Sequence, residues 1–80
     1  MPKIKFTKRF LMSFGRLPET EQEKIKQYIA LLVDNPRHPS LQSKLIQGAA
    51  GIYEVRMDSA YRMTYERQAD NTLVLRVVGE

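Results

Sequence analysis

The chain has 80 residues and a mass of 9.3 kDa, which is enough for one domain spanning residues 1–80. It contains no cysteine, so disulfides and thiolate zinc sites are excluded, and no apolar run approaches the roughly 20 residues that a membrane span needs. The formal net charge is +4, and a composition of 42% hydrophobic and 28% charged residues is typical of a folded globular protein. We therefore expect a cytoplasmic protein with no membrane partner.

The positive charge is concentrated at the beginning of the chain. The first 16 residues contain no acid and five basic side chains, namely Lys3, Lys5, Lys8, Arg9 and Arg16. Such a basic excess favours an anionic partner, because it steers the encounter and releases counterions on binding. The alternative interpretation is a solvated surface with a modest charge imbalance.

One short strand and two helices are predicted in the first half. Residues 3–7 alternate between polar and apolar side chains, as a strand does. A short helix is predicted by the spacing of Phe10, Leu11, Phe14 and Leu17, and it weakens at Gly15. Pro18 suits the start of a second helix. The apolar stripe of that helix consists of Ile25, Tyr28, Ile29, Leu32 and Val33. Asn35-Pro36 should end it, because proline disfavours helical geometry in the preceding residue.

A connector and three strands are predicted in the second half. Residues 35–51 contain two prolines and two glycines and are interpreted as a long loop. The strands are expected at residues 52–57, 61–67 and 72–78, with turns at Asp58-Ser59-Ala60 and Asp70-Asn71. The resulting order, β-α-α-β-β-β, predicts an α+β domain in which two helices pack on one face of an antiparallel sheet.

Alternation along the three strands separates two unlike faces of the sheet. The face expected beneath the helices carries Tyr53, Val55, Met57, Tyr61, Met63, Tyr65, Leu73, Leu75 and Val77. The opposite face carries Glu54, Arg56, Arg62, Thr64, Glu66, Val74, Arg76 and Val78. The second face is therefore predicted to be polar and rich in arginine.

The register of these strands predicts a row of arginines. If apolar residues meet across the strands, Met57 pairs with Tyr61, Arg56 faces Arg62, and Arg62 faces Arg76. Like charges directly opposite each other destabilise a sheet by a few tenths to about 1 kcal/mol, so an anionic ligand would relieve a real cost. Two alternatives stay open. The arginines can pair with nearby glutamates in a solvated ionic face, and the register can slip by one residue.

Six short motifs occur in a fixed order along most of the chain. They are Leu17-Pro18, Asn35-Pro36, Lys44-Leu45-x-x-Gly48, Tyr53-Glu54-Val55-Arg56, Tyr61-Arg62-Met63-x-Tyr65 and Val77-Val78-Gly79. Together they resemble the RelE/ParE superfamily of bacterial toxin–antitoxin toxins. The resemblance implies a toxin with the β-α-α-β-β-β fold that is held inactive by a small cognate antitoxin. Its RelE branch cleaves mRNA, often on the ribosome, without a metal or other cofactor, whereas its ParE branch poisons DNA gyrase.

The resemblance also implies roles for individual residues. In the RelE branch the ribose 2′-hydroxyl attacks the adjacent phosphorus, and Arg62 and Arg56 match basic positions of the family that act as catalytic residues. Lys44 matches the loop lysine and is expected either to bind RNA phosphate or to face solvent. Arg76 is included as an RNA-binding residue from the register argument alone. Glu54 stands where RelE itself has a basic residue, and it acts either as a general base or, as we favour, as the partner of an arginine.

Three functions remain open from the sequence. The chain ends at Gly79-Glu80, where many relatives continue with a further catalytic Arg, Tyr or His, so a weakened mRNA endoribonuclease is the first expectation. A gyrase inhibitor and an inactive antitoxin-binding module are the alternatives. His38, the single histidine, is predicted to be a surface loop residue, and the sequence has no metal-ligand spacing. The basic segment from Lys3 to Arg16 suits an acidic, partly disordered partner.

Overall fold

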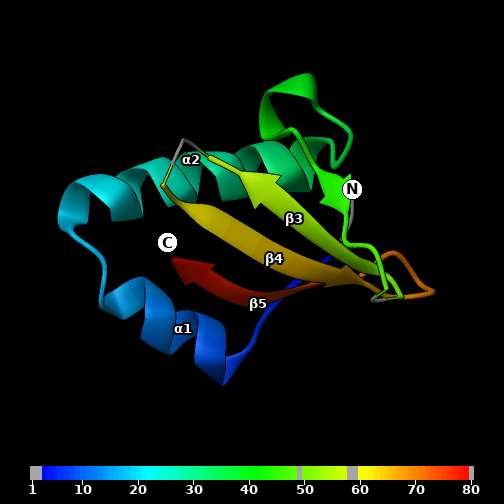
Figure 1. Ribbon diagram of the computed structural model, residues 1–80, viewed down its shortest axis with the longest axis horizontal. Helices are drawn as coiled ribbons and strands as arrows, with labels where there is room; N and C mark the ends of the chain where they lie inside the picture. The colour runs from blue at the N-terminus through cyan, green and yellow to red at the C-terminus, as the bar shows by residue number, and fades with distance from the viewer. Residues whose placement is uncertain (1–2, 49, 58–59, 80) are drawn as a thin grey trace.

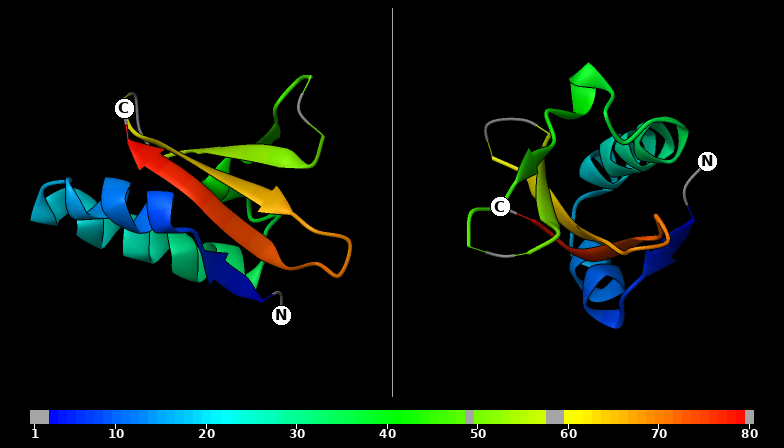
Figure 2. Two further views of the ribbon diagram at one scale, coloured as in Figure 1. Left: turned by 90° about the horizontal axis from the view of Figure 1, so that it is seen from below. Right: turned by 90° about the vertical axis from the view of Figure 1, so that its right-hand side faces the viewer.

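In the computed structural model the chain folds into a five-stranded sheet with two helices on one of its faces (Figures 1 and 2). The structure describes residues 3–48, 50–57 and 60–79. The elements in chain order are β1 (Ile4–Phe6), α1 (Lys8–Gly15), α2 (Glu19–Asp34), the 3-10 helix η1 (Pro39–Leu41), β2 (Lys44–Leu45), β3 (Ile52–Arg56), β4 (Arg62–Arg67) and β5 (Leu73–Gly79). The strands are ordered β1-β5-β4-β3-β2, and β1 pairs with β5 in parallel while the other neighbours are antiparallel. The predicted α+β class is confirmed.

The two helices begin and end where local chemistry requires. Thr7 caps α1, since its hydroxyl accepts a hydrogen bond from the backbone N–H of Phe10 at 3.0 Å and donates one to the Leu75 carbonyl at 2.8 Å. This second bond ties the start of α1 to β5. Helix α2 follows Pro18 and has acidic residues in its first turn, where the helix dipole favours them. It ends at Asp34, directly before Asn35-Pro36, as predicted.

The predicted connector contains more structure than its sequence indicated. It holds η1 and the two-residue strand β2, which pairs with β3 so that Lys44 lies opposite Glu54. A strand this short has too few residues to show alternation, which explains why it was missed. The predicted turn at 58–60 includes residues 58 and 59, which lie outside the described part of the chain. The turn at Asp70-Asn71 is confirmed: the Asp70 carboxylate accepts a hydrogen bond from the Thr72 backbone N–H, and that bond lowers the pKa of the Asp70 carboxyl group.

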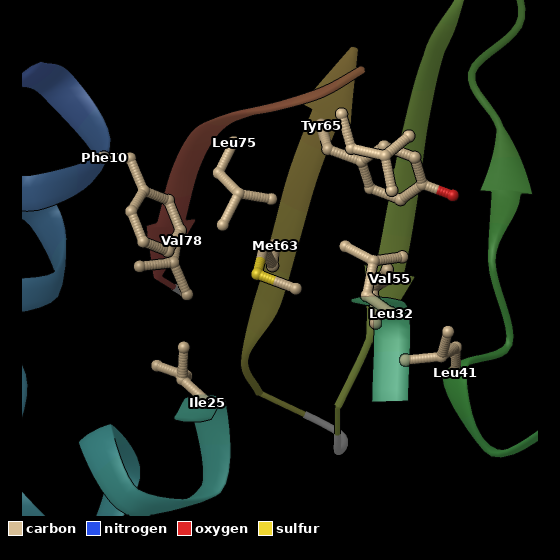
Figure 3. Packing of buried hydrophobic residues seen from close by; sticks show 10 residues of the cluster. Phe10, Ile25, Leu32, Leu41, Val55, Met63, Tyr65, Leu75 and Val78 are labelled. Carbon is tan, nitrogen blue, oxygen red and sulfur yellow. The ribbon is translucent and has the colours of Figure 1, made fainter. Parts of the chain in front are cut away.

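The hydrophobic core fills the space between the helices and one face of the sheet (Figure 3). Its buried members are Phe10, Ile25, Leu32, Leu41, Val55, Met63, Tyr65, Leu73, Leu75 and Val78. The α2 stripe is confirmed, since Ile25 and Leu32 are fully buried and the rest of the stripe is partly buried. Burial of Val55 and Met63 on this face leaves their neighbours Arg56 and Arg62 on the other.

A bulge in the β4–β5 pair overturns part of the predicted register. Tyr65 lies opposite Leu75, but the next residue back, Thr64, lies opposite Val77, so Arg76 is an extra residue in β5. The alternation of β5 is therefore reversed after Leu75, and Val78 is buried in the core in place of Val77. The prediction that Val77 lies beneath the helices is wrong for this reason. No helix in the described part of the chain is long and apolar enough to cross a membrane.

The packing predicts unequal costs for two leucine truncations. Leu32 is fully buried between α2 and the sheet, whereas the side chain of Leu11 on α1 is 55% exposed. We expect Leu32→Ala to lower the free energy of unfolding by about 2–5 kcal/mol, because it leaves a cavity. Leu11→Ala, the matched control, should change it by less than about 0.5 kcal/mol. Urea unfolding followed by circular dichroism measures both; a cost below about 1 kcal/mol for Leu32→Ala would contradict this packing.

Candidate nucleic-acid interface

Two arginines face each other on the side of the sheet that the helices leave open. Arg56 of β3 is directly opposite Arg62 of β4, as the sequence predicted. Both helices lie on the other side of the sheet (Figure 2). The Arg62 side chain is 47% exposed, and Arg56 is also exposed. The register therefore presents two guanidinium groups to solvent from adjacent strands, which is a suitable arrangement for binding a phosphate.

A carboxylate and a lysine complete this surface, which we call the arginine face and define as Lys44, Glu54, Arg56, Arg62 and Thr64. Glu54 lies between Lys44 on β2 and Thr64 on β4 in one row across the sheet. Its Oε2 atom is 3.8 Å from Nη1 of Arg62, its diagonal neighbour. An ion pair this long and this exposed is weak and is screened by salt. The favoured role of Glu54 as an arginine partner is thus consistent with the geometry, and a contact of 3.8 Å is too long to saturate the donors of Arg62.

A hollow lies on the β5 side of the arginine face, beside Arg62, and its lining includes a buried hydroxyl group. The hollow is lined by Glu54, Ala60, Arg62, Thr64, Val77, Val78 and Gly79. Within the described residues, Oγ1 of Thr64 is buried and makes no hydrogen bond. A buried hydroxyl group without a partner costs about 1–3 kcal/mol. The face therefore contains an unused neutral hydrogen-bonding group beside Arg62.

Arg76 is not part of the predicted row. Because of the bulge, Arg62 lies opposite Gly79, three residues along β5 from Arg76. Arg76 is instead the bulged residue next to Thr7, where β1 leads into α1. The Thr7 hydroxyl lies within hydrogen-bonding distance of the Arg76 carbonyl oxygen, at 3.1 Å. The prediction that Arg62 faces Arg76 is wrong, and the register argument for an RNA-binding role of Arg76 is lost with it.

The remaining candidate residues have structural roles. His38 accepts a hydrogen bond at Nδ1 from the backbone N–H of Ser40 at 3.1 Å and so caps η1. The rings of Tyr53 and Tyr65 stack on each other on the helix side of the sheet, with centroids 5.3 Å apart. The described residues contain no group of three or more side chains that could hold a metal ion.

Sequence reasoning missed two features of the arginine face. It placed Lys44 in a loop, although β2 fixes this lysine on the sheet directly opposite Glu54. It gave Thr64 no role, although this residue lines the hollow with a buried hydroxyl group. The motif containing Lys44 indicated that this lysine belongs to the site. The burial of the Thr64 hydroxyl group cannot be predicted from a single sequence.

Comparison with solved structures shows a close match in fold. The isolated RelE toxin of E. coli aligns with a TM-score of 0.80 at 23% identity, covering 100% of this chain and 84% of that one. The RelBE2 toxin–antitoxin complex of Mycobacterium tuberculosis gives a TM-score of 0.80 at 21% identity, with 100% and 99% covered. The RelB–RelE antitoxin–toxin complex of Methanococcus jannaschii gives 0.78 at 25% identity, with 92% and 86% covered.

These matches show that the chain has the fold of RelE toxins, as the sequence motifs implied. No protein-family model matches the sequence, and no curated protein matches it. The fold places β3 and β4 side by side at the centre of the arginine face.

The facing arginines predict a gain in stability when one of them is neutralised. We expect Arg56→Gln to raise the free energy of unfolding by a few tenths to about 1 kcal/mol at low salt, because it removes a like-charge pair. The gain should shrink as salt is added, since salt screens the repulsion. Arg76→Gln, which removes an exposed arginine outside the pair, is the matched control and should be neutral. Urea unfolding at two salt concentrations measures both variants; a loss of stability in Arg56→Gln, or a gain insensitive to salt, would contradict the repulsion.

Proposed function

We propose that this chain is the toxin of a type II toxin–antitoxin module and that it cleaves mRNA on its arginine face without a metal ion. The observation that carries the proposal is the pair Arg56 and Arg62, which face each other on an open sheet in a fold shared with RelE toxins. Repulsion between two arginines directly opposite each other destabilises the sheet, and a bound anion would offset that repulsion. A phosphodiester supplies the required charge.

The proposed reaction is a transesterification within the RNA strand. The 2′-oxygen forms a bond to the adjacent phosphorus as the bond from phosphorus to the 5′-oxygen breaks, which leaves a 2′,3′-cyclic phosphate and a 5′-hydroxyl. The proton lost from the 2′-hydroxyl is balanced by the proton gained at the 5′-oxygen. Negative charge grows on the phosphoryl oxygens in the transition state, so fixed cations beside them accelerate the reaction.

The residues of the arginine face are proposed to have different roles in this reaction. Arg62 lines the hollow and is proposed to contact the phosphoryl oxygens, with Arg56 opposite it on β3 as the second donor. A guanidinium group offers a planar set of hydrogen-bond donors that matches the geometry of a phosphate. Lys44 lies across β3 from the hollow and is proposed to bind the phosphate of a neighbouring nucleotide. Glu54, between these cations, is proposed to orient Arg62 through their ion pair.

The proposed protein partner is an antitoxin that binds a second surface. On β1 and α1 the exposed apolar side chains Phe6, Leu11 and Met12 are interspersed with the exposed basic residues Lys5, Lys8 and Arg9. This basic β1–α1 surface is complementary to a segment that carries both acidic and apolar side chains. Two of the structural neighbours are themselves complexes of a toxin with an antitoxin, which supports a partner of this kind.

The proposed function predicts a large effect of one arginine substitution. We expect Arg62→Ala to reduce RNA cleavage by about 10²–10³-fold, because it removes a contact that strengthens in the transition state. Arg76→Ala should reduce cleavage far less, since Arg76 is outside the facing pair. Cleavage of mRNA by the purified chain, alone and with translating ribosomes, measures the effect, and growth arrest on expression measures its consequence. Circular dichroism confirms that both variants fold.

Two outcomes would overturn this function. Growth arrest with intact transcripts and accumulated DNA breaks would assign the chain to gyrase inhibition. Arrest by Arg62→Ala as efficient as that by the parent chain would remove the arginine face from the activity. If expression of the parent chain affects neither growth nor RNA, the chain would be assigned to the third alternative, an inactive antitoxin-binding module.

A substitution at Glu54 separates its two candidate roles. If Glu54 orients Arg62, Glu54→Gln should tighten RNA binding several-fold, because a negative charge is removed from the face, and cleavage should stay within about tenfold of the parent rate. If Glu54 is the general base, the same change should reduce cleavage by about 10²–10⁴-fold while binding is retained. We expect the first result. Binding measured with an RNA that lacks the reactive 2′-hydroxyl, together with single-turnover cleavage, distinguishes the two.

A further inference from the structure

A second pocket lies on the helix side of the sheet, beyond the end of α2. It forms between the loop at 36–43 and the adjacent parts of β3 and β4. We call it the loop pocket and define it by six of its lining side chains, namely Arg37, His38, Ser43, Tyr53, Tyr65 and Arg67. The alternation of β4 places Tyr65 and Arg67 on the same face as buried Met63, so the sheet separates this pocket from the arginine face.

The loop pocket is positively charged. Arg37 and Arg67 both line it and are both exposed, and none of the described residues around it is acidic. The Arg67 guanidinium is held in place, since Nε and Nη2 donate to Oδ1 of Asn71 at 3.3 and 2.9 Å. A guanidinium oriented in this way loses less conformational entropy when it binds an anion.

His38 adds a neutral hydrogen-bond donor to the pocket, whereas the hydroxyl of Tyr65 is directed to Ser43. Because Nδ1 of His38 accepts the backbone N–H of Ser40, the proton of the neutral ring is on Nε2, which is available as a donor. The Tyr65 hydroxyl points toward the segment that leads to β2, where it donates to Oγ of Ser43 at 3.4 Å (Figure 3). Burial raises the pKa of Tyr65 despite the Ser43 hydrogen bond and the charge of Arg67, so this hydroxyl remains neutral at physiological pH.

Tyr53, which is partly buried, gives the pocket an aromatic surface, and its ring stacks on that of Tyr65, which is only 2% exposed. The rings of Tyr53 and Tyr65 are nearly parallel, with an interplanar angle of 9°, and both line the pocket beside the arginines. Cationic donors next to an aromatic wall are the combination that proteins use for nucleotides, because the phosphate binds the cations and the base packs on the ring.

From this juxtaposition we infer that the loop pocket is a second anion site, one that binds the phosphate group of a nucleotide through Arg37 and Arg67. The phosphate can belong to a free mononucleotide or to an RNA strand that passes the β2 edge of the sheet. The site uses none of the residues of the arginine face, so it does not depend on the proposed ribonuclease activity.

The test is a titration of the intact chain with inorganic phosphate, with AMP and with a short RNA lacking reactive 2′-hydroxyls, followed by NMR. We expect saturable shifts of the Tyr53, His38 and Arg67 signals with at least one of these probes. Arg37→Gln and Arg67→Gln should each weaken binding by about tenfold or more, as expected for a lost charge-assisted hydrogen bond. Arg76→Gln, which removes an exposed arginine of β5 that does not line the pocket, is the matched control and should leave the binding at this pocket unchanged.

The probes also identify the source of the phosphate. AMP that binds more tightly than inorganic phosphate supports a free nucleotide, and binding by the RNA alone supports a strand that crosses the sheet edge. If Arg67→Gln disturbs the β4–β5 turn through the loss of its hydrogen bonds to Asn71, the effect of Arg37→Gln alone decides whether the pocket binds the anion. Absence of saturable binding by all three probes would overturn the inference. Shifts confined to the arginine face, or binding unchanged in both pocket variants, would overturn it as well.

Discussion

The register between β3 and β4 is the constraint on which the surface chemistry of this protein depends. Val55 and Met63 are both fully buried against the helices, so the strands cannot slip by one residue without exposing them. That requirement also sets Arg56 opposite Arg62 on the other face. The hydrophobic core thus holds two like charges next to each other on the open face of the sheet.

The environment of this pair suits transient binding of a polyanion. Glu54 lies 3.8 Å from Arg62, close enough to orient the guanidinium but too far to saturate its donors. Thr64 adds a buried hydroxyl group without a partner among the described residues. The surface therefore keeps unsatisfied hydrogen-bonding capacity and net positive charge, both of which a phosphodiester would neutralise. The basic β1–α1 surface and the arginine face consist of different charged residues, and the hollows beside them meet at Val77 of β5.

The sequence was sufficient for the features that follow from periodicity. The apolar stripe of α2, its end at Asn35-Pro36 and the facing of Arg56 and Arg62 all come from residue spacing. The bulge in β5 could not be predicted, because Leu73, Val74, Leu75, Val77 and Val78 are apolar on both faces and give no preference for one alternation. The two-residue strand β2 was missed since its pairing depends on the neighbouring β3. The loop pocket combines residues from three separated segments, and their convergence is a property of the tertiary structure alone.

The most direct test of the central claim is a crystal structure of the chain with an RNA oligonucleotide in which hydrogen replaces the 2′-hydroxyl at the cleavage position. We predict that a phosphate lies on the open face of the sheet, within hydrogen-bonding distance of the guanidinium groups of both Arg56 and Arg62. RNA bound elsewhere on the molecule, with both guanidinium groups left in contact with protein and solvent only, would contradict it.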